Sequence, residues 1–149
     1  MLELFTREEI RIEKLNPGVY AAECDWPGSC ANPEREVRDV LLCGQVTGLP
    51  YVFAHTHLFP EALAPAVRAG LSQTSNPIGK VLKEHRVETF RQIEQRGCRA
   101  MPAVAEVLGG AATDQLQWRR YSVTSRGLVI LEITEAFSAH LFDPSGEPA

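Results

Sequence analysis

The chain contains 149 residues, of which 44% are hydrophobic and 23% charged, and its formal net charge is -4 at pH 7. Its length suits one domain with a substantial core, and its composition is that of a globular protein. We therefore expect a single domain over residues 1–149, with a flexible tail at 143–149. The acidic balance argues against a general nucleic-acid-binding surface but allows a local basic site for a small acid.

The sequence lacks the usual signals for membranes and export. It contains no run of about 18 apolar residues, so we expect no membrane-spanning helix and no membrane partner. The N-terminus, Met1 to Phe5, lacks the basic start and apolar stretch of a signal peptide. These features predict a cytoplasmic protein with reduced thiols at its four cysteines, Cys24, Cys30, Cys43 and Cys98.

The first half of the chain has the pattern of strands separated by turns. Ile10 and Ile12 alternate with Arg11 and Glu13, which is typical of a half-buried strand. In chain order, the pattern predicts a strand at 9–15, a turn at 16–18, a short strand at 19–25, a loop at 26–33, and a hairpin of strands at 36–44 and 51–59.

The second half begins with helices and ends with strands. Apolar residues at helical spacing, a good N-cap at Asn76 and Gly97 as a stop predict a long helix over 77–96. The other predicted elements are a helix at 61–71, a helix at 103–108, and a hairpin of strands at 117–124 and 128–137. Because strands come in hairpins with helices between them, the predicted class is α+β, with one antiparallel sheet and helices packed on it.

Asn76-Pro77-Ile78-Gly79 is the first candidate for ligand binding. The first amides of a helix have no acceptor within the helix and carry partial positive charge, so a carboxylate or phosphate could bind there. Gly79 leaves room for a ligand beside the backbone. The same four residues also suit an ordinary helix start, and the local sequence does not decide between these interpretations.

Glu135 and Arg38 are the charged candidates. Glu135 shares the parity of Leu131 and Ile133 on an apolar strand face, so it should be paired with an arginine, protonated, or at the rim of the sheet. Arg38 shares the parity of Val40; facing inward, it would offer a planar fork to a carboxylate. Alternatively, Arg38 is exposed or paired with Glu36 or Asp39.

Two further groups are less specific. Arg119, Arg120 and Tyr121 form a basic and aromatic patch whose alternation directs one arginine to each face of the sheet, and such charges are often solvated at the rim. His55 and His57 share one strand face and could bind a metal together, but no recognised spacing supplies a third ligand. We therefore predict no metal site.

Four segments resemble, in order and spacing, the chorismate pyruvate-lyase family, whose fold is shared with the ligand-binding (UTRA) domains of GntR-type regulators. The resemblance as a whole covers nearly the entire chain from about residue 9. The four segments are the arginine-led strand Val37-Arg38-Asp39-Val40-Leu41-Leu42-Cys43, its partner from Ala54 to Pro60, the helix start Asn76-Pro77-Ile78-Gly79-Lys80-Val81-Leu82, and a final hairpin with Trp118-Arg119-Arg120 and Ile133-Thr134-Glu135-Ala136-Phe137.

The resemblance implies a function and roles for these residues. The implied reaction eliminates pyruvate from chorismate to give 4-hydroxybenzoate, without a cofactor. Arg38 would bind the ring carboxylate, the main chain at Ile78 and Gly79 would contact the ligand, and Glu135 would hydrogen-bond the ring hydroxyl. Arg38 and Glu135 are thus the expected catalytic residues, and a small carboxylate is the expected ligand.

The sequence departs from the family pattern at two places. The family's second active-site arginine corresponds to Thr56, flanked by His55 and His57. A protonated histidine could replace part of that charge but not its bidentate geometry, so all three residues are candidate ligand contacts. The family's N-terminal helical flap corresponds to a region before and around Met1, so we expect a short flap.

These departures leave other functions open. A same-fold enzyme that tailors a natural product could act on another small acid, and the histidines around Thr56 favour that alternative. A third possibility is a non-catalytic domain that binds a small carboxylate, as the regulator domains do. The oligomeric state does not follow from the sequence.

Overall fold

The computed structural model describes residues 8–16, 20, 36–73 and 78–138. Its elements, in chain order, are β1 (Ile10–Lys14), β2 (Glu36–Gly44), β3 (Pro50–Leu58), the 3-10 turn η1 (Pro60–Ala62), α3 (Pro65–Gln73), α4 (Ile78–Glu84), β4 (Phe90–Ala100), α5 (Pro102–Val107), β5 (Gln115–Ser125) and β6 (Leu128–Phe137). No helix in this part of the chain has the length and apolar character needed to cross a membrane.

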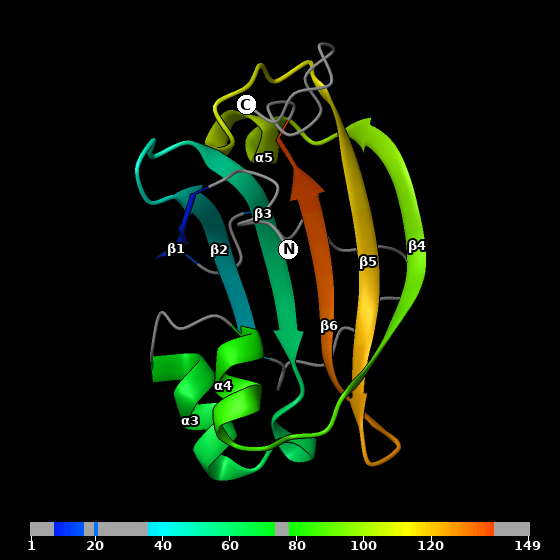
Figure 1. The fold of residues 1–149 in the computed structure, drawn as a ribbon. Helices are drawn as coiled ribbons and strands as arrows, with labels where there is room; N and C mark the ends of the chain where they lie inside the picture. The colour runs from blue at the N-terminus through cyan, green and yellow to red at the C-terminus, as the bar shows by residue number, and fades with distance from the viewer. Residues whose placement is uncertain (1–7, 17–19, 21–35, 74–77, 139–149) are drawn as a thin grey trace.

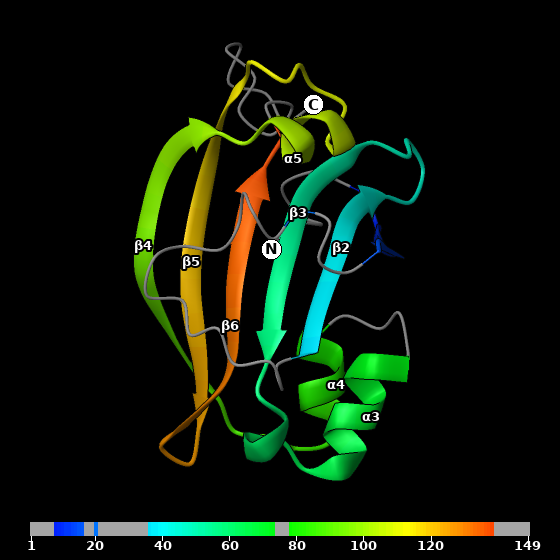
Figure 2. The same cartoon turned by 180° about the vertical axis from the view of Figure 1, so that it is seen from behind.

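The strands form one six-stranded sheet in the order β1-β2-β3-β6-β5-β4, and every neighbouring pair is antiparallel. Figures 1 and 2 show this sheet from its two sides, with α3 and α4 at one end and α5 at the other. The predicted α+β class with a single antiparallel sheet is confirmed. The central pairing of β3 with β6 joins the two predicted hairpins into one sheet.

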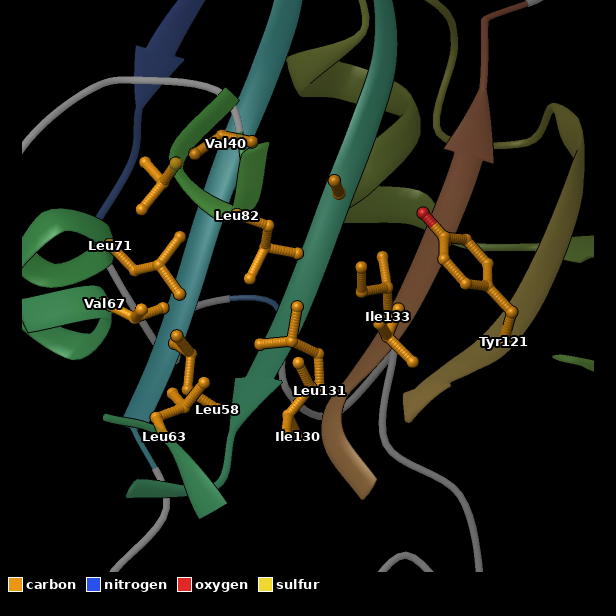
Figure 3. Close-up of a cluster of buried hydrophobic side chains, with 13 residues drawn as sticks. Val40, Leu58, Leu63, Val67, Leu71, Leu82, Tyr121, Ile130, Leu131 and Ile133 are labelled. Atoms are coloured by element: carbon orange, nitrogen blue, oxygen red, sulfur yellow. The ribbon is translucent and has the colours of Figure 1, made fainter. Parts of the chain in front are cut away.

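Apolar side chains cover both faces of the sheet. On one face, Val67 and Leu71 of α3 and Leu82 of α4 pack against strand residues that include Val40 and Ile133 (Figure 3). We call this side the α4 face. On the other side, which we call the α5 face, α5 packs on a second cluster that includes Leu41 and Phe53. The two faces follow from the pleat, because successive strand residues point to opposite sides.

Most predicted elements are confirmed, with shifts at their ends. The strands predicted at 9–15, 36–44, 51–59, 117–124 and 128–137 correspond to β1, β2, β3, β5 and β6, and the helix predicted at 103–108 corresponds to α5. The helix predicted at 61–71 begins later, as α3, after the short turn η1. The strand predicted at 19–25, the loop at 26–33, Asn76, Pro77 and the tail lie outside the described residues, Tyr20 excepted.

The long helix predicted over 77–96 is wrong. Helix α4 ends at Glu84, and Phe90 begins the edge strand β4, which pairs with β5. Phe90 and Ile93 were expected on the buried stripe of that helix, but both are exposed on β4. Gly97, predicted to stop the helix, lies within β4 opposite Trp118. Tertiary pairing with β5 therefore overrides the local helical pattern after residue 84.

Arg86 explains why the end of α4 was missed. Its φ is 54°, in the left-handed region where glycine is the usual residue. The amide of Val87 donates to the carbonyl of Leu82 at 2.9 Å, and the amide of Arg86 donates to the carbonyl of Lys83 at 3.1 Å. These two bonds are the Schellman helix ending, which usually has glycine where Arg86 stands.

Replacing Arg86 with glycine should stabilise the protein. A non-glycine residue in the left-handed region costs roughly 1–2 kcal/mol, part of which glycine loses again through its freer unfolded chain. We expect the free energy of unfolding in urea to rise by about 0.5–1 kcal/mol. The matched control Lys83→Gly, in the last turn of α4, should lower it by about 1 kcal/mol. A destabilised Arg86→Gly variant would contradict the assignment of this helix ending.

Candidate functional site

Two neighbouring rows of residues cross the α4 face through the four strands β2, β3, β6 and β5. Residues directly opposite each other in antiparallel strands point to the same side of the sheet. The first row consists of Arg38, Thr56, Ile133 and Tyr121, and the second consists of Val40, Ala54, Glu135 and Arg119. The register therefore places the two charged candidates, Arg38 and Glu135, on the same face.

Arg38 and Glu135 lie on strands separated only by β3. With strands about 4.8 Å apart, their backbones are separated by about 10 Å across the sheet and by about 7 Å along it. Both have long side chains on the same side, so a small molecule between them could contact both. The structure brings these two predicted residues together in this sense, although they are almost one hundred residues apart in the sequence.

Arg38 is a buried cation. Its residue is 6% exposed, and burial lowers the pKa of the guanidinium from its usual value. The two acidic residues named as its possible partners have contacts of their own: Glu36 pairs with Arg68 of α3, and Asp39 contacts His55. A carboxylate ligand beside Arg38 would offset part of the cost of burying its charge.

Thr56 lies directly opposite Arg38 and is 1% exposed. Its Oγ1 has no hydrogen-bond partner within the described part of the chain. A buried hydroxyl left without a partner costs about 1–3 kcal/mol, and a ligand oxygen held by Arg38 could supply the partner. The position that carries arginine in the resembled family therefore offers a neutral hydroxyl on the α4 face.

Glu135 takes the first of its predicted states, pairing with an arginine. The Nε of Arg119 donates to Oε1 of Glu135 at 2.7 Å, and the side chains of Glu135 and Arg119 are 12% and 42% exposed. The alternation predicted for the two arginines is confirmed. Arg119 lies on the α4 face, whereas Arg120 is buried on the α5 face, where its Nε lies 3.6 Å from Oε2 of Glu94.

Tyr121 adds a phenol to the same face. Burial of the ring, reinforced by the nearby negative charge of Glu135, raises the pKa of Tyr121 to about 12. The phenol therefore remains protonated at neutral pH and can donate a hydrogen bond. Tyr121 is thus a neutral hydrogen-bond donor beside the carboxylate of Glu135, which is an acceptor. A ligand carboxylate could accept from the phenol, and a ligand hydroxyl could donate to Glu135.

Helix α4 packs beside these rows. Ile78 is half-buried against the cluster that contains Val40 and Ala54, and Gly79 is exposed. A Cβ added to Gly79 would meet no atom of the described residues within 4 Å. The predicted ligand contacts of Ile78 and Gly79 stay a prediction.

The structure separates His55 and His57 from Arg38. Both histidines point to the α5 face, because they alternate with Thr56 along β3. The Nδ1 of His55 contacts Oδ1 of Asp39, and the Nε2 atoms of the two imidazoles lie 3.1 Å apart. Only Thr56 of the three faces the Arg38 side, so a histidine cannot supply the missing charge there. Among the described residues, no group of three or more metal-ligating side chains is arranged to hold a metal.

The family model described as "Chorismate pyruvate-lyase Rv2949c-like" matches residues 1–143. The chain belongs to this chorismate pyruvate-lyase family. The resemblance inferred from the four segments is thereby confirmed.

The proteins that are similar to this chain differ in what their names state. "Putative lyase MJ0807" of Methanocaldococcus jannaschii is 26% identical over 143 residues, which cover 93% of this chain and 70% of that protein. "Chorismate pyruvate-lyase" of Mycobacterium leprae is 28% identical over 106 residues, which cover 70% of this chain and only half of that protein. A GntR-family transcriptional regulator from Bacillus cereus superposes with a TM-score of 0.57 at 12% identity, covering 87% of this chain and 92% of that chain. The last comparison shows the fold alone.

For this member of the family, Arg119 is the site residue that the sequence undervalued. The sequence shows it only as one of two adjacent arginines in a basic and aromatic patch, yet it makes the ion pair to Glu135. The signal lay in the shared parity of Arg119 and Tyr121, but choosing the residue opposite Glu135 required the exact register of β5 and β6. Tyr121 was noted only as part of the same patch.

Proposed function

We propose that the protein is a lyase that eliminates pyruvate from chorismate to give 4-hydroxybenzoate. The observation that carries the proposal is the shared face of Arg38 and Glu135, two motif residues of the matched family that are far apart in sequence. The family match supports the reaction class, and this placement supports a ligand that contacts both residues.

The reaction needs no oxidant or cofactor. The bond between a ring carbon and the ether oxygen breaks, the carbon that bears the hydroxyl loses a proton, and the electron pair of that C–H bond enters the ring. The enolpyruvyl fragment gains a proton and leaves as pyruvate. Because the ring becomes aromatic, the reaction has a large driving force, and the protein's main task is to hold a reactive conformer away from water.

Each residue has a role in this proposal. Arg38 would bind the ring carboxylate through its planar fork, and the Thr56 hydroxyl would hydrogen-bond the same group. Glu135, as a carboxylate paired with Arg119, would accept a hydrogen bond from the ring hydroxyl and help remove the ring proton. The backbone at Ile78 and Gly79 would contact the ligand from the α4 side.

The direct test is to mix the purified protein with chorismate and follow 4-hydroxybenzoate by chromatography. We expect turnover, and we expect Glu135→Gln to lower kcat by about 100- to 10,000-fold, the usual contribution of general acid–base catalysis. The matched control Glu106→Gln changes an exposed glutamate of α5 and should leave kcat unchanged. Absence of product over hours at high protein concentration would refute the proposal.

A non-catalytic role in binding a small carboxylate is the second candidate. The similarity to a GntR-family regulator favours it, because the shared fold includes regulatory proteins. Tight binding of 4-hydroxybenzoate by calorimetry, together with chorismate that remains unchanged, would support this role. A tailoring enzyme acting on another small acid would show neither turnover nor tight binding with these two compounds.

A further inference from the structure

Arg119 holds Glu135 with only part of its guanidinium. Its Nε donates to Glu135, and within the described residues its two terminal nitrogens have no hydrogen-bond partner. The side chain is 42% exposed and belongs to a residue of the α4 face, so solvent reaches part of it on that side of the sheet. An arginine has five N–H donors in a fixed fork, so the donors left over can bind a second anion while Nε keeps its bond to Glu135.

Aromatic rings hold this guanidinium in place. Its central carbon lies 5.5 Å from the ring centroid of Tyr121 and 5.5 Å from that of Phe137. Arginine is attracted to an aromatic face within about 6 Å, and two such contacts restrict its orientation. Together with the bond to Glu135, they position the terminal nitrogens before any ligand arrives, which lowers the ordering cost of binding.

The α4 face lacks a positive charge where the resembled family has one. Position 56 is a threonine, and the neighbouring histidines face the other side of the sheet. A substrate with two carboxylates would therefore have Arg38 for one of them and would need another cation for the second. Arg119 lies across the same face from Arg38, on the far side of Glu135, with unused donors.

We propose that Arg119 binds the second carboxylate of a dicarboxylate substrate through its terminal nitrogens, while Arg38 binds the first. The inference rests on the proposed function, in which chorismate carries a ring carboxylate and an enolpyruvyl carboxylate. Arg119 then neutralises two anions at once, Glu135 and the enolpyruvyl group. The aromatic product has a single carboxylate, held by Arg38, so it makes no direct contact with Arg119 and the site distinguishes substrate from product.

The test compares one ligand that has the second carboxylate with one that lacks it. For Arg119→Gln we expect the KM for chorismate to rise by about 10-fold or more, as for loss of a charge-assisted hydrogen bond. The Kd for 4-hydroxybenzoate should change by less than about 3-fold. For Arg119→Lys the KM for chorismate should be intermediate, because an ammonium group keeps the charge but lacks the planar fork that can bind two carboxylates at once. Equal loss of affinity for both ligands would overturn the proposal.

A second measurement separates direct contact from an effect through Glu135. Chorismate binding is measured by calorimetry in Glu135→Gln and in the double variant Glu135→Gln/Arg119→Gln. If Arg119 contacts the ligand, its removal should weaken chorismate binding by about 10-fold in this background too. If Arg119 acts only by holding Glu135, the second substitution will have no effect and the proposal fails.

Failure of the proposed function would be recognised separately. If the unmodified protein binds chorismate without converting it, the lyase proposal fails, and the comparison of the two ligands still tests Arg119 by affinity alone. If it converts chorismate and Arg119→Gln has an unchanged KM, the lyase proposal stands and the Arg119 inference is overturned. If it binds neither compound, both are overturned.

Discussion

Arg38→Gln should lose nearly all activity on chorismate while keeping a native fold. Two charge-assisted hydrogen bonds from the guanidinium to a carboxylate contribute about 1.5–3 kcal/mol each, so we expect kcat/KM to fall on the order of 100-fold or more. Arg38→Lys keeps the charge but loses the fork, so its kcat/KM should lie between that of the unmodified protein and that of Arg38→Gln. Initial rates of 4-hydroxybenzoate formation over a range of chorismate concentrations measure both variants.

Binding of the product gives an independent reading of the same side chain. Arg38→Gln should weaken 4-hydroxybenzoate binding as well, because the ring carboxylate is present in substrate and product alike. This sets it apart from Arg119→Gln, for which only chorismate should be affected. The control Arg11→Gln removes an exposed arginine on β1 and should leave both constants unchanged. Full activity in Arg38→Gln would place the site elsewhere.

The sequence was sufficient to predict the hairpins because their signals are local. Apolar runs mark β2 and β3, and Arg126-Gly127 closes the turn between β5 and β6, where both residues have positive φ (52° and 78°). Parity within a single strand was also reliable. It placed Arg38 with Val40 and Glu135 with Ile133, and the structure puts all four on the α4 face.

The partner of Glu135 could not be predicted from the sequence, because a bulge sets the register. Counting back from the pair Ser125 and Leu128 at the turn would place Trp118 opposite Glu135. The register shifts between Val123 and Thr124, so Arg119 takes that position instead. A shift of one residue exchanges the two faces of a strand. The arginine that pairs with Glu135 therefore depends on a bulge, and the residues of the turn do not predict that bulge.

The long predicted helix failed for a related reason. Ile78, Val81 and Leu82 have true helical spacing, and Phe90 and Ile93 extend that spacing by coincidence. What ends the helix is the left-handed conformation of Arg86, a residue type with no preference for it. What makes the following segment a strand is its ladder with β5, whose paired residues lie 15 to 34 positions farther along the chain. Local patterns carry neither piece of information.

Asp39, the residue next to Arg38 in β2, should affect stability and not activity when it is replaced. Asp39 points to the α5 face, where its Oδ1 contacts Nδ1 of His55, and both side chains are fully buried. The Nε2 of His55 lies 3.1 Å from that of His57, so one of these two nitrogens must donate and the other accept. Asp39 therefore fixes the first hydrogen bond of a buried chain of three polar groups, which makes it a structural residue in our interpretation.

Asp39→Ala should accordingly destabilise the fold rather than alter catalysis. Removing one partner of a buried hydrogen bond to a charged group costs about 1–3 kcal/mol or more, because the other partner is left without a hydrogen bond. Urea denaturation should show this loss, while any folded fraction retains the KM of the unmodified protein. Asp39→Asn keeps an acceptor for His55 and should lose less.

A double-mutant cycle tests whether the effect belongs to the pair. If Asp39 and His55 stabilise each other, the loss in Asp39→Ala/His55→Ala should be smaller than the sum of the two single losses. Glu13→Ala, an exposed change on β1, serves as the surface control and should stay within about 0.5 kcal/mol. If Asp39→Ala lost less than about 1 kcal/mol of stability and instead raised the KM for chorismate, Asp39 would have a functional and not a structural role. The two adjacent residues of β2 thus give opposite expectations, activity for Arg38 and stability for Asp39, and the pleat of one strand is the reason for both.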